Sequence, residues 1–173
     1  RFCYETQPLK DEIHRRNLLP HLQSLVKHYN SWPDKSTEKS LIHILNDIGI
    51  IFYQMDNLIS AKSYHVHALR ISEEYYGINH IETALILADL AAVYGWLGQS
   101  KQHQEILQGI LKIFQDHYGK DHPKVAKVLN NLAMTYTDLG NPRYAKSILE
   151  EAFKIYIKNY DEKHLEVGNI LTN

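Results

Sequence analysis

Apolar residues along most of the chain recur at the spacing of one face of an α-helix. Near the C-terminus they lie at i, i+3, i+4, i+7 and i+10, as Leu129, Leu132, Ala133, Tyr136 and Leu139. This spacing places the five side chains on one side of an α-helix, so it predicts an amphipathic helix. Glycine and proline are few, with 8 and 5 residues in the chain. We therefore expect an all-α fold.

The same stripe occurs three times at a fixed interval. Leu45, Leu87 and Leu129 share one position, 42 residues apart, and the segment at 160–173 begins a further copy. A constant period of this size is the mark of a repeat architecture. The third position of the stripe is always small, which lets a neighbouring helix approach closely; its residues are Gly49, Ala91 and Ala133.

Turn residues divide each repeat into two helices. Gly98 and Gly140 follow the first helix of their repeats, where a left-handed C-cap is expected, and Asp56-Asn57 takes that place in the first copy. The second helix is expected to end at Tyr76-Gly77 and Tyr118-Gly119. Candidate N-caps for the next helix are Asn79 and Asp121, and Pro123 suits a first helical position.

This register of a small residue, an aromatic and a glycine resembles the tetratricopeptide repeat (TPR) more than HEAT or armadillo repeats. The usual TPR period is ~34 residues; the longer period seen here is similar to that of kinesin light chains. The resemblance implies an α-α superhelix, a solenoid of antiparallel helix pairs. The expected division is an N-terminal helical cap at 1–37, repeats at 38–79, 80–121 and 122–163, and a partial fourth repeat at 164–173.

The N-terminal segment departs from the repeat but keeps helical spacing in LLPHLQSLVKHY, where Pro20 suits a helix start. The stretch LLPHLQSLVKHYNSW also resembles the segment that leads into TPR arrays in NB-ARC-type signalling ATPases of the STAND class. The sequence contains no GxxxxGK[ST] phosphate loop, so an ATPase part would lie outside this chain. We expect the chain to be part of a longer polypeptide.

Composition excludes some classes of partner. The formal net charge is -1, from 19 basic and 20 acidic residues, which argues against a general nucleic-acid binder. No apolar run reaches the length of a membrane span. Cys3 is the single cysteine, so no intrachain disulfide forms, and a reducing, cytoplasmic location is expected.

The 11 histidines invite a metal reading, but their pattern follows the repeat. His80, His122 and His164 are equivalent residues of successive repeats, and packed helices lie about 8–10 Å apart, too far for one shared metal. We interpret them as turn residues that satisfy helix-end groups. His14, His21 and His28 lack a carboxylate or thiolate cluster. No GxSxG, HExxH or DxDxDG motif occurs, so we predict no catalytic residue, no cofactor and no enzyme activity.

The TPR resemblance implies that the first helices line a concave groove that binds a protein or peptide. Asn131 lies where TPR proteins often place an asparagine that bonds a peptide backbone. Asp47 and Asp89 replace the residues that hold a terminal carboxylate in some TPR domains, so we expect a ligand with some positive charge, anchored at Trp96 or Leu85. The predicted groove residues are His43, Asp47, Ile50, Gln54, Leu85, Asp89, Ala92, Trp96, Lys127, Asn131, Met134, Asp138, Asn169 and Asn173.

The leading expectation is therefore a non-catalytic TPR scaffold for protein–protein interaction. One alternative is a regulatory sensor array within a larger STAND-type signalling ATPase. A second is a self-association module, in which the partial fourth repeat leaves Leu165, Ile170 and Leu171 to form a homodimer.

Overall fold

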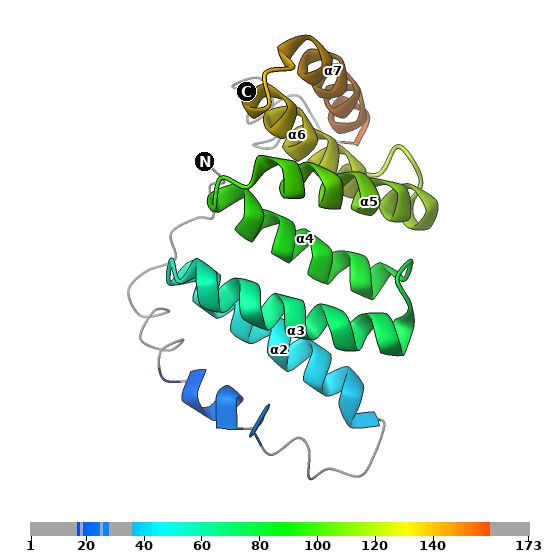
Figure 1. Ribbon diagram of the computed structural model, residues 1–173. Helices are drawn as coiled ribbons and strands as arrows, with labels where there is room; N and C mark the ends of the chain where they lie inside the picture. Colours follow the sequence, from blue (N-terminus) through cyan, green and yellow to red (C-terminus); the bar gives the residue numbers. More distant parts are fainter. Residues whose placement is uncertain (1–16, 18, 25, 28–35, 160–173) are drawn as a thin grey trace. The chain divides into compact units, whose positions relative to one another are not determined.

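The computed structural model describes residues 17, 19–24, 26, 27 and 36–159 (Figure 1). Within these residues every regular element is a helix, which confirms the predicted all-α class. The N-terminal described residues are helical as well, and helix has already formed at Asn17, so Pro20 is not its first residue. The helices with defined bounds are α2 (Ser36–Gln54), α3 (Leu58–Tyr76), α4 (Ile81–Trp96), α5 (Ser100–Tyr118), α6 (Pro123–Asp138) and α7 (Pro142–Asn159).

The chain separates into two compact units, Arg1–Tyr75 and Tyr76–Asn173. The first unit contains α2 and all but the last residue of α3, and the second contains α4 to α7. The predicted repeat boundaries are a finer division, and they stay a prediction.

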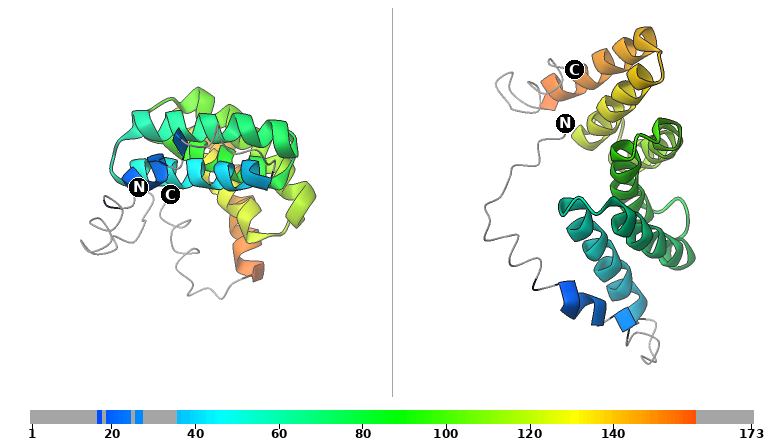
Figure 2. Two further views of the ribbon diagram at one scale, coloured as in Figure 1. Left: turned by 90° about the horizontal axis from the view of Figure 1, so that it is seen from below. Right: turned by 60° about the vertical axis from the view of Figure 1, so that its left-hand side comes forward.

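The second unit has one continuous hydrophobic core. Helix α5 packs against both α4 and α6, and α6 packs against α7. The pairs α4–α5 and α6–α7 run antiparallel (Figure 1), and the second pair is clear in the right-hand view of Figure 2. The small positions Ala91 and Ala133 are 2% and 0% exposed in this core. Small side chains at these points let the helices approach closely, as the sequence predicts.

The first unit buries the apolar face of α2 against α3. Ile42, Leu45 and Ile48 of α2 are almost fully buried. The ring of Phe52 stacks on Tyr64 of α3, with centroids 5.4 Å apart. Gln23 in the N-terminal helical segment donates a hydrogen bond from Nε2 to Tyr64 Oη at 3.1 Å. This bond joins that segment to α3.

The first three positions of the predicted stripe are buried in every copy except at Leu87, whereas the aromatic fourth position is half-buried throughout. Leu45 and Leu129 are buried, whereas their equivalent Leu87 is half-buried and packs against the core cluster. The last stripe position follows the helix, and Leu139 there is 39% exposed. The stripe also omits a buried position one residue before the aromatic, which is occupied by Ile51, Val93 and Thr135.

The turns after the first helices have the predicted left-handed backbone. The φ angles of Gly98 and Gly140 are 68° and 79°, and Asp56 has φ 57° in the first copy. Among the described residues, Asp56 is the only one other than glycine that has a positive φ angle. Aspartate tolerates this conformation better than most residues, because its short side chain bonds locally.

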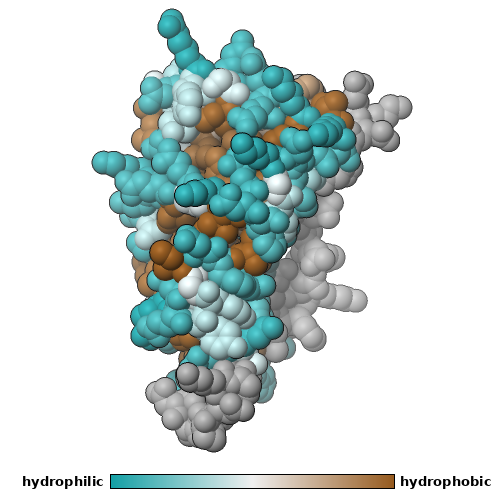
Figure 3. All heavy atoms as spheres, turned by 90° about the vertical axis from the view of Figure 1, so that its right-hand side faces the viewer, coloured by the Kyte–Doolittle hydropathy of each residue, from teal (hydrophilic) through white to brown (hydrophobic). Residues whose placement is uncertain are grey.

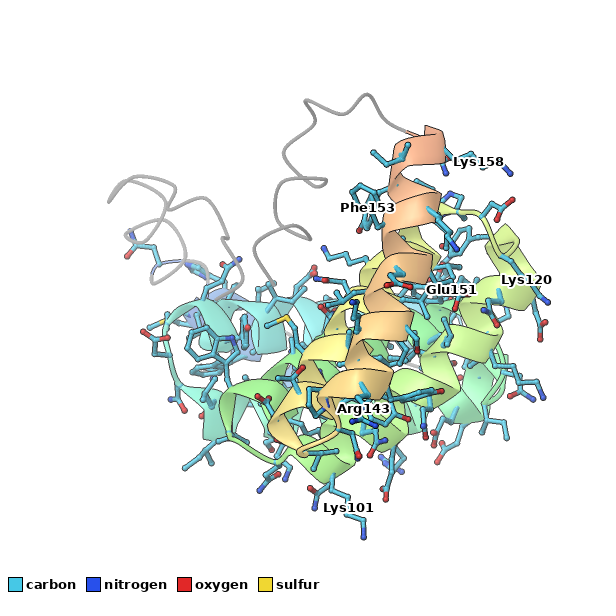
Figure 4. All side chains as sticks on the ribbon, turned by 90° about the horizontal axis from the view of Figure 1, so that it is seen from above. Lys101, Lys120, Arg143, Glu151, Phe153 and Lys158 are labelled. Atoms are coloured by element: carbon cyan, nitrogen blue, oxygen red, sulfur yellow. The ribbon has the colours of Figure 1, made fainter. Side chains whose placement is uncertain are left out.

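The predicted N-caps are wrong, because the histidine next in the chain takes that role. His80 Nδ1 accepts the Glu82 backbone N–H at 3.2 Å, and His122 Nδ1 accepts that of Lys124 at 3.1 Å. Asp121 instead pairs with Lys158 of α7, whose side chain lies at the end of that helix in Figure 4. The interpretation of these histidines as residues that satisfy helix-end groups is thus confirmed for two of the three; His164 lies outside the described residues.

Each capping histidine also stacks on the tyrosine that ends the preceding helix. The ring centroids of Tyr76 and His80 lie 4.7 Å apart, as do those of Tyr118 and His122. The stacking holds each imidazole at the start of its helix. The recurring Tyr-Gly-x-x-His segment thus connects the end of one helix to the N-cap of the next.

Candidate functional site

The predicted groove positions on α6 lie between its buried residues. Lys127 and Asp138 are exposed, and Asn131 and Met134 are half-buried. Their neighbours Leu129 and Leu132 are 3% and 2% exposed, because they face the core. Helix α6 therefore presents a row of three polar side chains and Met134 on the face next to its core stripe.

Asn131 is the distinctive residue of this row. Its side-chain Oδ1 is buried and has no hydrogen-bond partner among the residues that the structure describes. Its backbone carbonyl accepts a bond from Thr135 Oγ1 at 2.8 Å. A buried acceptor without a partner destabilises a protein by about 1–3 kcal/mol, so such groups in native proteins call for an explanation. A ligand that supplies an N–H donor would remove this penalty.

Helix α4 offers an apolar surface in the same unit. The indole of Trp96 on its last turn is 54% exposed. Leu85 packs partly against the core cluster that contains Leu129 and Leu132. Asp89 and Ala92 are half-buried. An exposed tryptophan next to a packed core is a suitable anchor for a large apolar side chain.

The predicted groove residues of the first unit lie on α2. His43, Asp47 and Gln54 are exposed, and Ile50 is half-buried. Partial burial raises the pKa of Asp47, and the nearby His43 opposes this by favouring the carboxylate. Asn169 and Asn173 lie outside the described residues. The α4 and α6 residues thus belong to one compact unit, and the α2 residues belong to the other.

The sequence analysis assigned no role to His103, a half-buried histidine whose ring lies within hydrogen-bond distance of Thr135 on α6. His103 of α5 replaces the alanine that Ala61 and Ala145 provide in the other copies, and it packs against Gly95 of α4. A Cβ at Gly95 would lie 3.0 Å from the imidazole Cε1. Burial lowers the pKa of His103, and the carboxylate of Asp138 acts in the opposite direction. The sequence indicates this contact only through His103, a large residue at a position where the other copies have alanine.

Neither a cluster of metal-binding side chains nor a membrane-spanning helix is found among the described residues. Among them, no group of three or more His, Cys, Asp or Glu is placed to hold a metal ion. His21 is exposed, and His14 and His28 lie outside the described residues. None of the described helices is both long and apolar enough to cross a membrane. Glu73, Glu74, Glu150 and Glu151 are exposed, as expected of solvated helix faces.

Two open cavities lie elsewhere. One of about 350 Å³ is lined by Asn79, Ile81, Lys112, Ile113, Asp116 and His117, and one of about 380 Å³ by Val26, Glu38, Leu41, His67, Arg70, Ile71 and Glu74. Neither contains a predicted groove residue. Figure 3 shows the side with the α3–α4 and α5–α6 turns, where hydrophilic side chains surround smaller hydrophobic areas.

Comparison with solved structures supports a helical-repeat fold. BtubC (BKLC) from P. vanneervenii has a TM-score of 0.83 at 18% identity, and the alignment covers 94% of this chain and 65% of BtubC. The nearly identical TPR-like repeats of a Podosopora anserina protein named as a kinesin light chain give 0.74 at 17% identity, covering 90% and 74%. The N-terminal domain of stress-induced protein-1 (STI-1) from C. elegans gives 0.57 at 11% identity, covering 80% and 99%.

The family assignment comes from the sequence itself. No curated protein matches the chain. The family model described as tetratricopeptide repeat matches residues 40–102 and 82–158, which together are more than half of the chain. The predicted TPR resemblance is therefore confirmed, and the chain belongs to the tetratricopeptide repeat family.

Proposed function

We propose that α4 and α6 of the second unit form a groove that binds an extended peptide segment of a partner protein, without catalysis. TPR proteins are generally non-catalytic interaction scaffolds, which supports the class of function. The observation that carries the proposal for this chain is the buried, unpartnered Oδ1 of Asn131.

An asparagine side chain suits a peptide backbone because it offers one acceptor and two donors. Once the half-buried amide turns toward the surface, the Oδ1 of Asn131 accepts a backbone N–H of the ligand, and its Nδ2 donates to a ligand carbonyl. An extended peptide exposes such groups along its length, whereas a helix uses them internally. The geometry therefore favours an extended ligand over a helical one.

The other predicted groove positions of the unit supply charged and apolar groups for the side chains of the ligand. Asp138 is exposed at the C-terminal end of α6. Lys127, in the first half of the same helix, is the cation among the predicted groove positions of this unit. A single lysine gives weak support to a terminal carboxylate. The exposed indole of Trp96 supplies an apolar contact. We propose a ligand that combines a basic side chain with a large apolar one.

The test is selection from a displayed library of random peptides on the whole chain, followed by affinity measurement with the selected peptide. Asn131→Ala is expected to lose about 1–3 kcal/mol of binding free energy, which is roughly 5- to 150-fold in affinity. The same variant is expected to be at least as stable as the original chain, because a methyl group replaces an unpaired buried acceptor. A loss of affinity with a gain in stability separates a binding role from a structural one.

The matched control is Asn130→Ala, which removes the neighbouring amide from the same helix. Asn130 is half-buried but lies outside the groove row, so its variant keeps the affinity once folding is verified by circular dichroism. Selection of acidic C-terminal peptides, or equal binding by Asn131→Ala, would overturn the proposal.

Self-association is the second candidate, and a partly exposed apolar row on α7 favours it. Leu149, Phe153 and Ile157 are half-buried at helical spacing, and Figure 4 marks Phe153. Leu165, Ile170 and Leu171, on which the predicted homodimer rests, lie outside the described residues. Light scattering over a range of concentrations tests the proposal, and a constant monomer mass would exclude it.

Two finer proposals rest on sequence alone. The single cysteine supports a cytoplasmic location. The stretch LLPHLQSLVKHYNSW resembles the segment that precedes TPR arrays in STAND-type ATPases, and this supports a sensor array. The chain spans 65% of the length of BtubC. A phosphate-loop motif in a longer reading of the gene would favour the sensor array.

A further inference from the structure

His103 contacts the helices that carry the groove from both sides. Its ring, which projects from α5, lies against Gly95, the residue before Trp96 on α4. Its Nδ1 lies 3.1 Å from Thr135 Oγ1 of α6. Thr135 is one helical turn after Asn131 and bonds its carbonyl. One imidazole therefore spans α4, α5 and α6 beside the proposed site.

The hydrogen bonds of Thr135 fix the tautomer of this imidazole. A threonine hydroxyl has one proton, and Thr135 donates it to the Asn131 carbonyl at 2.8 Å. The same oxygen then accepts from His103, so Nδ1 carries the ring proton and Nε2 is free to take a second one. Protonation consequently leaves the bond to Thr135 intact and adds a charge at the other side of the ring.

We propose that His103 is a positioning residue of the groove, which ties the last turn of α4 to the Asn131 turn of α6 and, when protonated, draws Asp138 toward itself. This inference rests on the proposed peptide-binding function. Protonation of His103 then removes the Asp138 carboxylate from a ligand with a basic side chain. The groove accordingly binds its peptide more weakly in acid.

Burial lowers the pKa of His103, and the carboxylate of Asp138 on α6 acts in the opposite direction. Gly95 of α4 brings no charge, and Lys101 on α5 itself points away from the helices in Figure 4. The imidazole is therefore neutral at pH 7, and the proton that enters at lower pH has Asp138 as its partner.

The first test needs no ligand. In the isotopically labelled whole chain, the Trp96 indole N–H and the Asn131 side-chain amide are followed by NMR from about pH 7 to pH 5. Both signals are expected to shift together in the original chain and to stay constant in His103→Ala. Alanine suits this position because Ala61 and Ala145 are buried at its equivalents.

The conservative variant His103→Gln separates positioning from filling of space. Glutamine retains a donor for Thr135 but does not titrate, so it should hold the Asn131 amide near its original shift and abolish the pH dependence. It also serves as the test variant where alanine does not fold. Signals that do not titrate in the original chain, or that titrate equally in the variants, would overturn the inference.

Affinity for the library-selected peptide completes the test. The original chain should bind about fivefold or more weakly at pH 5 than at pH 7, whereas His103→Gln should show a flat profile. Equal pH profiles in both proteins would refute the role of His103 while leaving the groove intact. Unchanged affinity in Asn131→Ala would instead refute the groove itself.

Discussion

At the scale of the residue, the buried His65 and the half-buried His103 are each matched by a glycine on the facing helix. His65 of α3 lies against Gly49 of α2 and bonds Asn46 Oδ1 through Nδ1 at 2.9 Å. His103 lies against Gly95 in the same manner. A Cβ at Gly49 would lie 2.6–2.8 Å from three ring atoms of His65, which is closer than real contacts allow. Ring and glycine thus form one packing unit.

Gly49→Ala is expected to destabilise the first unit by about 1–3 kcal/mol, because the added methyl group displaces the His65 ring. The double variant Gly49→Ala/His65→Leu should recover most of this loss. It recreates the pairing of the other copies, where Ala91 and Ala133 occur with Leu107 and Leu149. Urea unfolding of both variants measures the effect, and a single variant as stable as the original chain would contradict it.

His65 also predicts a pH dependence of stability. The side chain is 1% exposed, and burial lowers its pKa to about 4 from an ordinary 6.5. The unfolded chain takes up the proton first as the pH falls, so stability is lost between about pH 6.5 and pH 4 and levels off below. The total loss is about 3 kcal/mol.

Unfolding by urea at several pH values checks this slope. The Gly49→Ala/His65→Leu variant has no titrating group at the position, so its stability should change less over the same range. An equal slope in both proteins would show that another group carries the pH dependence.

At the scale of the element, the sequence predicted which segments form helices but not how each begins. The C-terminal turns were predicted correctly, since Gly98 and Gly140 are the residues that a left-handed backbone favours. The N-caps were misplaced by one residue because Asn79 and Asp121 are intrinsically better caps than histidine. Stacking on the preceding tyrosine overrides that preference, and it depends on a contact that propensities do not include.

His122→Ala is expected to destabilise the chain by about 1 kcal/mol, because it leaves the Lys124 backbone N–H without its acceptor. His122→Asn should retain more stability, since asparagine is a favourable N-cap. Thermal unfolding compares both variants with the original chain. An alanine variant as stable as the original chain would count against the capping role.

At the scale of the whole molecule, the repeat predicted the fold class but not the division into two units. A constant period treats every interface between repeats as equivalent, so it contains no information on where the contacts become sparse. The candidate groove was likewise predictable as a row of positions on α6. The unpaired Oδ1 of Asn131 and the role of His103 were not, because both depend on atoms from neighbouring helices.

The two units predict local rather than global effects of a core mutation. Leu132 is 2% exposed in the core of the second unit, and Leu132→Ala should destabilise that unit by about 2–5 kcal/mol. Hydrogen exchange should increase in α4 to α7 and change little in α2 and α3, because contacts in repeat arrays are local. Uniform acceleration in all six helices would contradict this expectation.

The match between Gly49 and His65 has a consequence for how such arrays can be recombined. Both residues belong to one helical hairpin, so α2 and α3 are compatible with each other before any neighbour is added. A chimera that inherits the hairpin intact keeps the pair, whereas one joined at the loop between the two helices places an imidazole against a foreign side chain. Crossover points for protein engineering, or for gene fusion in evolution, therefore fall between hairpins.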